Sequence, residues 1–262
     1  VYMHPYSAAK MVSSLAFLHG RRIYLNMVAG GFKNDLTALN DTTPHDLRYE
    51  RLIEYTSIVR KLLEGGSVSF EGRFYKVQNV RLSPKLAPEL FPGILVSGSS
   101  AAGMAAAREM GAIAVKYPEP PEKCATNGRP EDVSCGVRIG MIARERAKLA
   151  WDIAFERFPE DRKGQLTRQL ATKISDSAWH KRLSELGEDN NGTYWLHPFE
   201  NYQTNCPYLV GSYESVAREV ARYVSAGYKT YILDIPASEE EFEHIGNVFN
   251  AATSAVTSGA SL

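Results

Sequence analysis

The sequence lacks the features that mark several large classes of protein. It has no excess of charge, because 30 lysines and arginines balance 30 aspartates and glutamates. Such a balance provides no basic field for nucleic acid or for an anionic membrane surface. The longest apolar runs, such as residues 93–96, are far shorter than the roughly 20 residues of a membrane span. We therefore expect neither nucleic acid nor a membrane as a partner.

Cysteine is also scarce. The chain has three cysteines, Cys124, Cys135 and Cys206, and their spacing matches no metal-binding motif. They are typical of reduced thiols, so we predict no metal site and no disulfide. The first residues lack the charged-then-apolar pattern of a secretion signal. These absences predict a cytoplasmic protein, and 262 residues suffice for one large domain.

What the sequence does contain is an alternation of short apolar segments with longer amphipathic ones. The short apolar segments predict five buried strands, at 22–29, 93–97, 112–117, 135–143 and 228–236. Apolar residues at helical spacing predict helices at 5–19, 44–63, 101–111, 146–158, 213–227 and 239–250. Strands that alternate with helices indicate parallel βα units.

Two segments interrupt this alternation. Residues 66–80 alternate apolar and polar residues around Glu71-Gly72, which predicts a hairpin insertion. The segment near 161–207 is strongly charged up to residue 191, with helical spacing around 165–173 and 177–186. We interpret it as an insertion that acts as a lid.

The strand count favours a barrel over an open sheet. A closed βα barrel needs eight strands, whereas five are predicted here and the chain opens inside an element. We therefore expect a single barrel domain over 1–262, partial at its N-terminus, with about three βα units preceding Val1. The competing fold, an open doubly wound sheet, would carry a GxGxxG fingerprint, and GSSAAG at 98–103 does not match it.

The first strand-to-helix corner carries polar residues of interest. Asn26 interrupts an apolar strand, either as an amide satisfied by neighbouring backbone or as a group that faces a ligand. After Gly30-Gly31 and a polar loop, Thr43 is predicted to cap a helix that begins at Pro44. His45 and Tyr49 are four residues apart and share a face of that helix. By spacing alone, they could bind a ligand or simply bond to the loop and pack.

The second strand-to-helix corner, at residues 94–103, has the same order of strand, glycine break and helix, with serines at the helix start. Gly98-Ser99-Ser100 precedes a helix rich in alanine. Free N–H groups and the helix dipole favour a phosphate at such a start. A serine that caps a helix without any ligand is the simpler alternative.

An aromatic stretch at 192–210 is the predicted substrate site. Aromatic rings supply apolar area, and hydroxyl, amide or imidazole groups can orient a substrate. The alternative is a loop held to the surface by its own aromatic residues. We assign the pocket wall to Tyr194, Trp195, His197 and Tyr202.

These segments, taken in order, resemble a known family. The match lies in LNMVAGG, in HDLRYERLIEYTSIVRKLLEG, in LVSGSSAAG, in GVRIGMIARE and in the run LVGSYESVAREVARYVSAGYKTYILDIP. Together they resemble the flavin-dependent luciferase-like monooxygenases, nearest the alkanesulfonate monooxygenase branch. The resemblance implies a TIM (β/α)8 barrel with insertions, of which the strand ending in LNMVAG is the fourth.

The resemblance also implies a chemistry. The family uses reduced FMN, supplied by a flavin reductase, and O2, which form a flavin peroxide that oxidises a small organic substrate. Position by position, it implies flavin contacts at Asn26, His45 and Tyr49, with His45 catalytic, and a phosphate-binding turn at Ser99 and Ser100. A homodimer is plausible by the same resemblance.

Several alternatives remain open at this point. The chain could be a flavin-binding barrel without turnover, or a deazaflavin-dependent oxidoreductase. An alkanesulfonate substrate would need a basic residue, for which Arg138, Arg144 and Lys173 are candidates.

Overall fold

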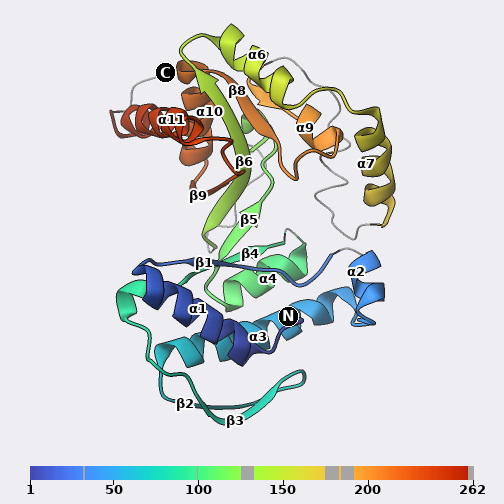
Figure 1. The fold of residues 1–262 in the computed structure, drawn as a ribbon, viewed down its shortest axis with the longest axis vertical. Helices are drawn as coiled ribbons and strands as arrows, with labels where there is room; N and C mark the ends of the chain where they lie inside the picture. The colour runs from blue at the N-terminus through green and yellow to red at the C-terminus, as the bar shows by residue number, and fades with distance from the viewer. Residues whose placement is uncertain (32, 99, 125–132, 175–182, 184–191, 259–262) are drawn as a thin grey trace. The chain divides into compact units, whose positions relative to one another are not determined.

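The computed structural model describes residues 1–31, 33–98, 100–124, 133–174, 183 and 192–258. The chain divides into two compact units, Val1–Val115 and Lys116–Leu262, which we call the N-terminal and the C-terminal unit and describe separately (Figure 1).

The N-terminal unit combines parallel strands with helices and one hairpin. β1 pairs in parallel with β4, and β4 with β5, so that Asn26 lies opposite Leu95 and Leu95 opposite Ile113. The unit contains α1 (Pro5–His19), β1 (Tyr24–Met27), α2 (Lys33–Ala38), α3 (His45–Glu64), β2 (Ser67–Glu71), β3 (Lys76–Arg81), η1 (Pro88–Leu90), β4 (Gly93–Ser97), α4 (Ala101–Glu109) and β5 (Ile113–Lys116), whose last residue begins the next unit.

The helices of this unit begin and end where local chemistry dictates. α1 has the bounds predicted from the sequence: the His4 side chain caps its start and Gly20, at φ 58°, ends it in the left-handed region. α3 buries the predicted stripe of Leu52, Tyr55, Val59 and Leu62. Periodicity therefore predicted the course of both helices.

The apolar residues at helical spacing in α1 are only partly buried, although Val12 is 5% exposed. Met11 and Leu18 are 53% and 73% exposed, whereas Ala9 and Ala16 are fully buried. α1 packs along α3 (Figure 1), and small side chains permit a close helix approach. The stripe of small residues, not the stripe of large ones, therefore marks the packed face.

The predicted hairpin is present as β2 and β3, which pair antiparallel. Its turn is held by one carboxylate from α3, because Glu54 accepts hydrogen bonds from the backbone N–H groups of Arg73, Phe74 and Tyr75 at 2.8–3.1 Å. The hairpin is thus fixed to the helix that carries His45.

The C-terminal unit is built on one long buried strand, β6. The first half of β6 pairs in parallel with β9, from Cys135 to Ile139, and the second half pairs in parallel with β8, from Gly140 to Arg144. The unit contains α5 (Pro121–Cys124), β6 (Cys135–Arg144), α6 (Ala147–Arg157), α7 (Arg162–Ile174), β7 (Tyr194–Trp195), α9 (His197–Glu200), β8 (Tyr208–Ser212), α10 (Tyr213–Ser225), β9 (Tyr228–Leu233) and α11 (Glu239–Ser258).

Several elements differ from the sequence-based prediction, and three of them matter for the fold. β8 was assigned to the aromatic loop, although Tyr208–Ser212 is a buried strand. α2 lies within the predicted polar loop, and α11 continues to Ser258 instead of ending near residue 250. The predicted helix at 165–173 is present within α7, whereas the one at 177–186 falls mostly outside the described residues.

Candidate cofactor site

The ends of β1 and β4 bring two polar side chains together. Ser97 Oγ donates to Asn26 Oδ1 at 2.8 Å, and the strands that carry them are parallel neighbours. The Asn26 amide oxygen thus bonds to a side chain at a strand end. Ligands of parallel α/β proteins bind beyond the carboxyl ends of their strands, so this pair lies where a ligand is expected.

His45 and Tyr49 form the second part of the site. Their rings meet edge to face, with 5.3 Å between centroids and 67° between planes, so the predicted shared face is present. Tyr49 is buried. His45 Nδ1 lies 2.7 Å from Asp46 Oδ1. If Nδ1 donates to that carboxylate, Nε2 is an acceptor in the neutral ring and a donor in the protonated ring.

Gly98 brings the two corners into contact. A Cβ at this position would lie 2.5 Å from the Tyr49 hydroxyl oxygen, and a Cβ at Gly103 would lie 3.0 Å from the carbonyl of Gly98. The first turn of α3, the turn after β4 and the start of α4 therefore converge, and glycine is required for that approach.

The start of α4 has the properties of an anion site. Ser100 Oγ accepts a hydrogen bond from Gly103 N at 3.1 Å. The N–H groups of Ala101 and Ala102 have no acceptor within the helix, and the first turn of this nine-residue helix has no acidic residue. The dipole therefore favours an anion there. Ser99, predicted to share this role, lies outside the described residues.

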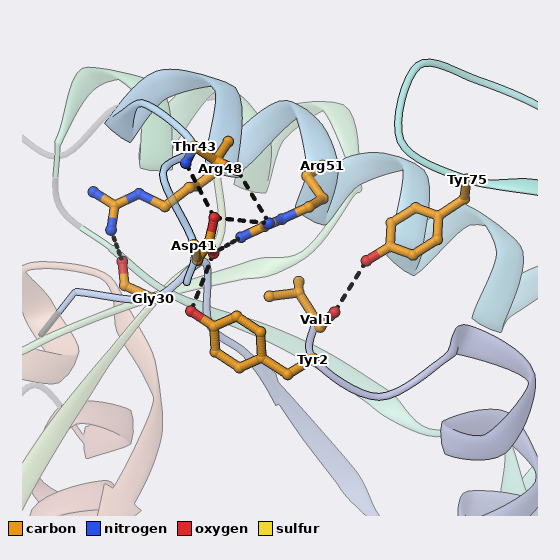
Figure 2. A network of polar contacts seen from close by, with 8 residues as sticks. All are labelled: Val1, Tyr2, Gly30, Asp41, Thr43, Arg48, Arg51 and Tyr75. Carbon is orange, nitrogen blue, oxygen red and sulfur yellow. Dashed lines mark hydrogen bonds and ion pairs between the residues drawn. The ribbon is translucent and has the colours of Figure 1, made fainter. Parts of the chain in front are cut away.

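A network of polar contacts fixes the loop that leads to His45 (Figure 2). Arg51 donates to both carboxylate oxygens of Asp41, at 2.6 and 3.2 Å. The same carboxylate accepts from Thr43 N at 3.1 Å and from the Tyr2 hydroxyl at 3.2 Å. The hydrogen bonds from Arg51 hold the pKa of Asp41 well below its ordinary value.

This network corrects the predicted helix start. The N-cap of α3 is Pro44, without a side-chain cap, because the Thr43 hydroxyl accepts from Arg51 at 3.2 Å instead. The loop is ordered instead by Asp41, through its hydrogen bonds with Thr43 N and Arg51.

Arg48 ties the same helix to the end of β1. Its side chain is almost fully buried, and Nη1 donates to the carbonyl oxygen of Gly30 at 3.0 Å. Arg48 was missed by sequence reasoning, together with Asp41, Arg51, Ser97 and Gly98. A signal existed for Arg48, since it lies four residues before Leu52 and thus in the buried stripe of α3.

The predicted substrate residues lie in the C-terminal unit, and two of them are packing residues. The Tyr194 hydroxyl donates to the Pro118 carbonyl at 2.7 Å, and burial raises its pKa well above the ordinary value. Trp195 belongs to a buried apolar cluster with Phe158 and Tyr208, and the His197 ring stacks on it with centroids 5.3 Å apart. This arrangement matches the alternative in which the aromatic residues fix their own segment.

Tyr202 differs from the other three. It is 43% exposed, and its φ of 57° places it in the left-handed region, which is uncommon for a tyrosine. Of the four predicted residues, it therefore has the greatest freedom to meet a ligand.

Two of the basic residues considered for a sulfonate already have carboxylate partners. Arg144 is paired with the buried Glu241, and Arg138 lies 3.5 Å from Asp234, which also accepts from the Tyr208 hydroxyl at 2.8 Å. An anionic substrate would have to displace a bound carboxylate at either position.

Metal and membrane features are absent from the part of the chain that the structure describes. No group of three or more histidine, cysteine or acidic residues there could hold a metal ion. The three cysteines are free thiols, and burial raises the pKa of Cys206 to about 12. Among the described helices, none combines the length and the apolar character that crossing a membrane requires.

Known proteins resemble this chain in sequence. The profile of the family described as "Luciferase-like monooxygenase" matches residues 1–230. The chain is 36% identical over 257 residues to the 4-(gamma-L-glutamylamino)butanoyl-[BtrI acyl-carrier protein] monooxygenase BtrO of Niallia circulans, covering 94% of this chain and 75% of that protein.

Solved structures share the fold at low sequence identity. A riboflavin lyase crystallised with modified FMN and riboflavin superposes with a TM-score of 0.69 at 16% identity, covering 99% of this chain and 69% of that one. An F420-dependent secondary alcohol dehydrogenase superposes with a TM-score of 0.61 at 16% identity, covering 95% of this chain and 75% of that one.

Proposed function

Because the chain belongs to the luciferase-like monooxygenase family, we propose that it uses FMNH2 and O2 to oxidise a small organic substrate. The observation that carries the proposal is the convergence of the two corners, where the Tyr49 hydroxyl lies against Gly98 and Ser97 bonds to Asn26. When bound, the reduced flavin supplies the electrons with which one atom of O2 enters the substrate and the other leaves as water.

The residues of the N-terminal unit fit a flavin phosphate. The start of α4 offers N–H donors without a competing acidic residue, and glycines at 98 and 103 let Tyr49 and the turn after β4 pack closely against that helix start. Ser100 and this helix start would hold the phosphate. Asn26 and Tyr49 would contact the ring system.

His45 is the proposed acid-base group. Asp46 orients its ring through Nδ1 at 2.7 Å, and the side chain remains 39% exposed. Its Nε2 would hold or release a proton beside the reacting atoms, a role that suits an imidazole near neutral pH. The segment near 161–207 would exclude water as a lid.

The setting of the reaction is also part of the proposal. We place the enzyme in the cytoplasm, with a separate flavin reductase as the source of FMNH2 and with a homodimer as its assembly. The substrate is an alkanesulfonate-like or other small organic molecule. The N. circulans relative is named for an acyl group on a carrier protein, which makes a carrier-bound acyl group a second substrate to test.

A deazaflavin-dependent hydride transfer is the second candidate function. It is favoured by the similarity to the F420-dependent alcohol dehydrogenase. Hydride transfer consumes no oxygen, so the two reactions differ in a measurable product.

Oxygen uptake tests the proposal. With a flavin reductase, NADH and FMN present, we expect oxygen consumption above the reductase background that is coupled to substrate loss. A flavin-binding protein without turnover would leave the background unchanged. Substrate oxidation with F420 and without oxygen uptake would replace the proposal by the second candidate.

A further inference from the structure

Arg168 is a buried cation whose hydrogen-bonding groups are not all used. The residue lies in α7 and is 5% exposed. Its guanidinium carbon lies 3.5 Å from the centroid of the Phe199 ring, which stabilises the charge through the ring face. Among the described residues, its Nε and Nη2 atoms have no hydrogen-bond partner.

These two atoms form one edge of the guanidinium group. The Nε–H and one Nη2–H bond point in the same direction and match two oxygens of a carboxylate, sulfonate or phosphate group. Stacking on Phe199 uses the face of the group, and the edge keeps no hydrogen-bond partner among the described residues. Two buried N–H groups without an acceptor destabilise the folded chain unless a ligand supplies the acceptor.

Two other guanidinium groups with little solvent exposure form ion pairs and show the contrast. Arg51 donates to both oxygens of Asp41, and Arg144 is paired with Glu241. For Arg168, burial has the largest effect and lowers the pKa of the guanidinium to about 10, against the opposing charges of Tyr202, Tyr117 and Glu200. Within the described part of the chain, the Nε and Nη2 atoms of Arg168 therefore have no carboxylate acceptor of the kind that Arg51 and Arg144 have.

The position of Arg168 is fixed by tight packing of α7 on α9. A Cβ at Gly164 would lie 1.9 Å from the carbonyl oxygen of Asn201. The Asn201 side chain accepts from Asp161 N at 2.8 Å and from Gln165 Nε2 at 3.1 Å. A guanidinium edge that is held in place by such packing is preorganised, which favours binding of a matching anion.

We propose that the Nε–Nη2 edge of Arg168 binds an oxyanion carried by the substrate, which is a carboxylate, sulfonate or phosphate group on an otherwise apolar molecule. Apolar character follows from the neighbours of the stacked ring, because Phe199 clusters with Leu183 and Leu196. That the anion belongs to a substrate rests on the proposed function. The binding residue is then Arg168 and not one of the basic residues considered from the sequence, Arg138, Arg144 and Lys173.

Calorimetric titration of the flavin-free protein tests this inference without any need for turnover. The probes are hexanesulfonate, hexanoate, hexyl phosphate and the neutral hexanamide. We expect at least one anion to bind about tenfold or more tightly than the amide, since hydrogen bonds to charged groups contribute at this level. The anion that binds best identifies the class.

Three substitutions in α7 test whether Arg168 is the residue that binds the anion. Arg168→Met should abolish the preference for the anion. Arg168→Lys, which keeps the charge but lacks the two parallel N–H donors, should retain only part of it. Arg162→Met removes an exposed arginine from the same helix and should keep the preference. Circular dichroism of each variant checks the fold, and Arg168→Lys serves as the test if Arg168→Met does not fold.

The inference is overturned if no anion binds more tightly than hexanamide, or if the preference survives in Arg168→Met. FMN titration of the same samples keeps the two proposals apart. Anion binding without FMN binding would reject the proposed function alone, whereas FMN binding without an anion preference would reject the role of Arg168 alone.

Discussion

His45 combines exposure with an oriented ring. Asp46 fixes one nitrogen and Tyr49 meets the ring at its edge, so replacement by alanine removes a side chain that supports little of the core. We expect His45→Ala to lower turnover with FMNH2 by about 100- to 10,000-fold, the range of general acid-base catalysis. Steady-state oxygen uptake measures the loss.

A second histidine provides the control for this variant. His19 ends α1 and is exposed, so His19→Ala should retain turnover. Unfolding midpoints of both variants should stay close to that of the parent. Unchanged turnover in His45→Ala would remove this residue from the mechanism.

Asp41 makes stability depend on pH. Its pKa is lowered in the folded chain, chiefly by hydrogen bonds from Arg51, so the folded state favours the ionised form. The resulting stabilisation is complete above the ordinary aspartate pKa and is lost as the pH falls toward the lowered value. Asp41→Asn should reduce the free energy of unfolding near neutral pH by about 2 kcal/mol.

Urea unfolding at several pH values measures both effects. The difference between the parent and Asp41→Asn should shrink as the pH drops below about 4, where the free carboxylate takes up its proton. Asp35→Asn, at an exposed position in α2, is the matched control and should show no such trend. A difference that stays constant with pH would contradict the assignment.

At the scale of single residues, sequence patterns showed which positions share a face but not which groups bond. The spacing of His45 and Tyr49 predicted their contact, and the polar break at Asn26 marked a strand end. Asp41 was not predictable, because its partners Arg51 and Tyr2 are brought to it by the tertiary fold. For the same reason, the sequence could not show that the Tyr194 hydroxyl donates to the Pro118 carbonyl or that Trp195 is buried, and their place in a pocket wall stays a prediction.

At the scale of elements, Gly98 decides how closely the turn after β4 approaches α3. Gly98→Ala would place a Cβ 2.5 Å from the Tyr49 hydroxyl oxygen, so the helix start or the turn must shift. We expect the affinity for FMN to fall at least tenfold, because misplaced phosphate donors lose charge-assisted hydrogen bonds. Fluorescence quenching of FMN measures the affinity.

The double variant tests the geometric cause. Adding Tyr49→Phe to Gly98→Ala removes the hydroxyl and leaves ring carbons at 3.2 Å, so part of the lost affinity should return. If Tyr49→Phe alone weakens FMN binding as much as the double variant does, the hydroxyl acts on the flavin and the steric explanation is wrong.

Two helical glycines give opposite predictions for the same substitution. At Gly164 in α7, a Cβ would lie 1.9 Å from the Asn201 carbonyl oxygen, whereas at Gly246 in α11 it would meet nothing within 4 Å. Gly246→Ala should stabilise the chain by about 0.5–1 kcal/mol through helix propensity. Gly164→Ala should instead destabilise it by about 1–3 kcal/mol through overpacking, as thermal unfolding will show.

Elements were predictable where one local signal dominated. Periodicity predicted α1 and α3, and the serine at 212 marked the start of α10, where its side chain accepts from Ser215 N. β8 was missed because its residues continue an aromatic stretch and its strand character depends on pairing with the second half of β6. The buried face of α1 was missed because small residues carry no hydrophobic signal.

At the scale of the whole molecule, the family match confirms the predicted fold class, a luciferase-like TIM barrel. The alternation of strands and helices predicted parallel βα units, and the resemblance of the quoted motifs specified the luciferase-like type. The substrate was not predictable, because none of the sequence motifs specifies one.

Ligand-induced stabilisation provides a test of the cofactor that does not require the substrate. A ligand that binds only the folded state stabilises it by about 2.7 kcal/mol at 100 times its Kd, which corresponds to a rise of roughly 5–10 °C in Tm for a chain of this size. FMN should produce such a rise. Riboflavin, which lacks the phosphate, should produce a smaller one if the start of α4 holds that group.

The same measurement distinguishes the two candidate cofactors. Gly98→Ala, which disturbs the phosphate turn, should bring the rise with FMN close to the rise with riboflavin, because both ligands would then bind through the ring alone. An equal rise for FMN and riboflavin in the parent protein would contradict a phosphate site at Ser100. A rise with F420 that exceeds the rise with FMN would instead favour hydride transfer over oxygen chemistry.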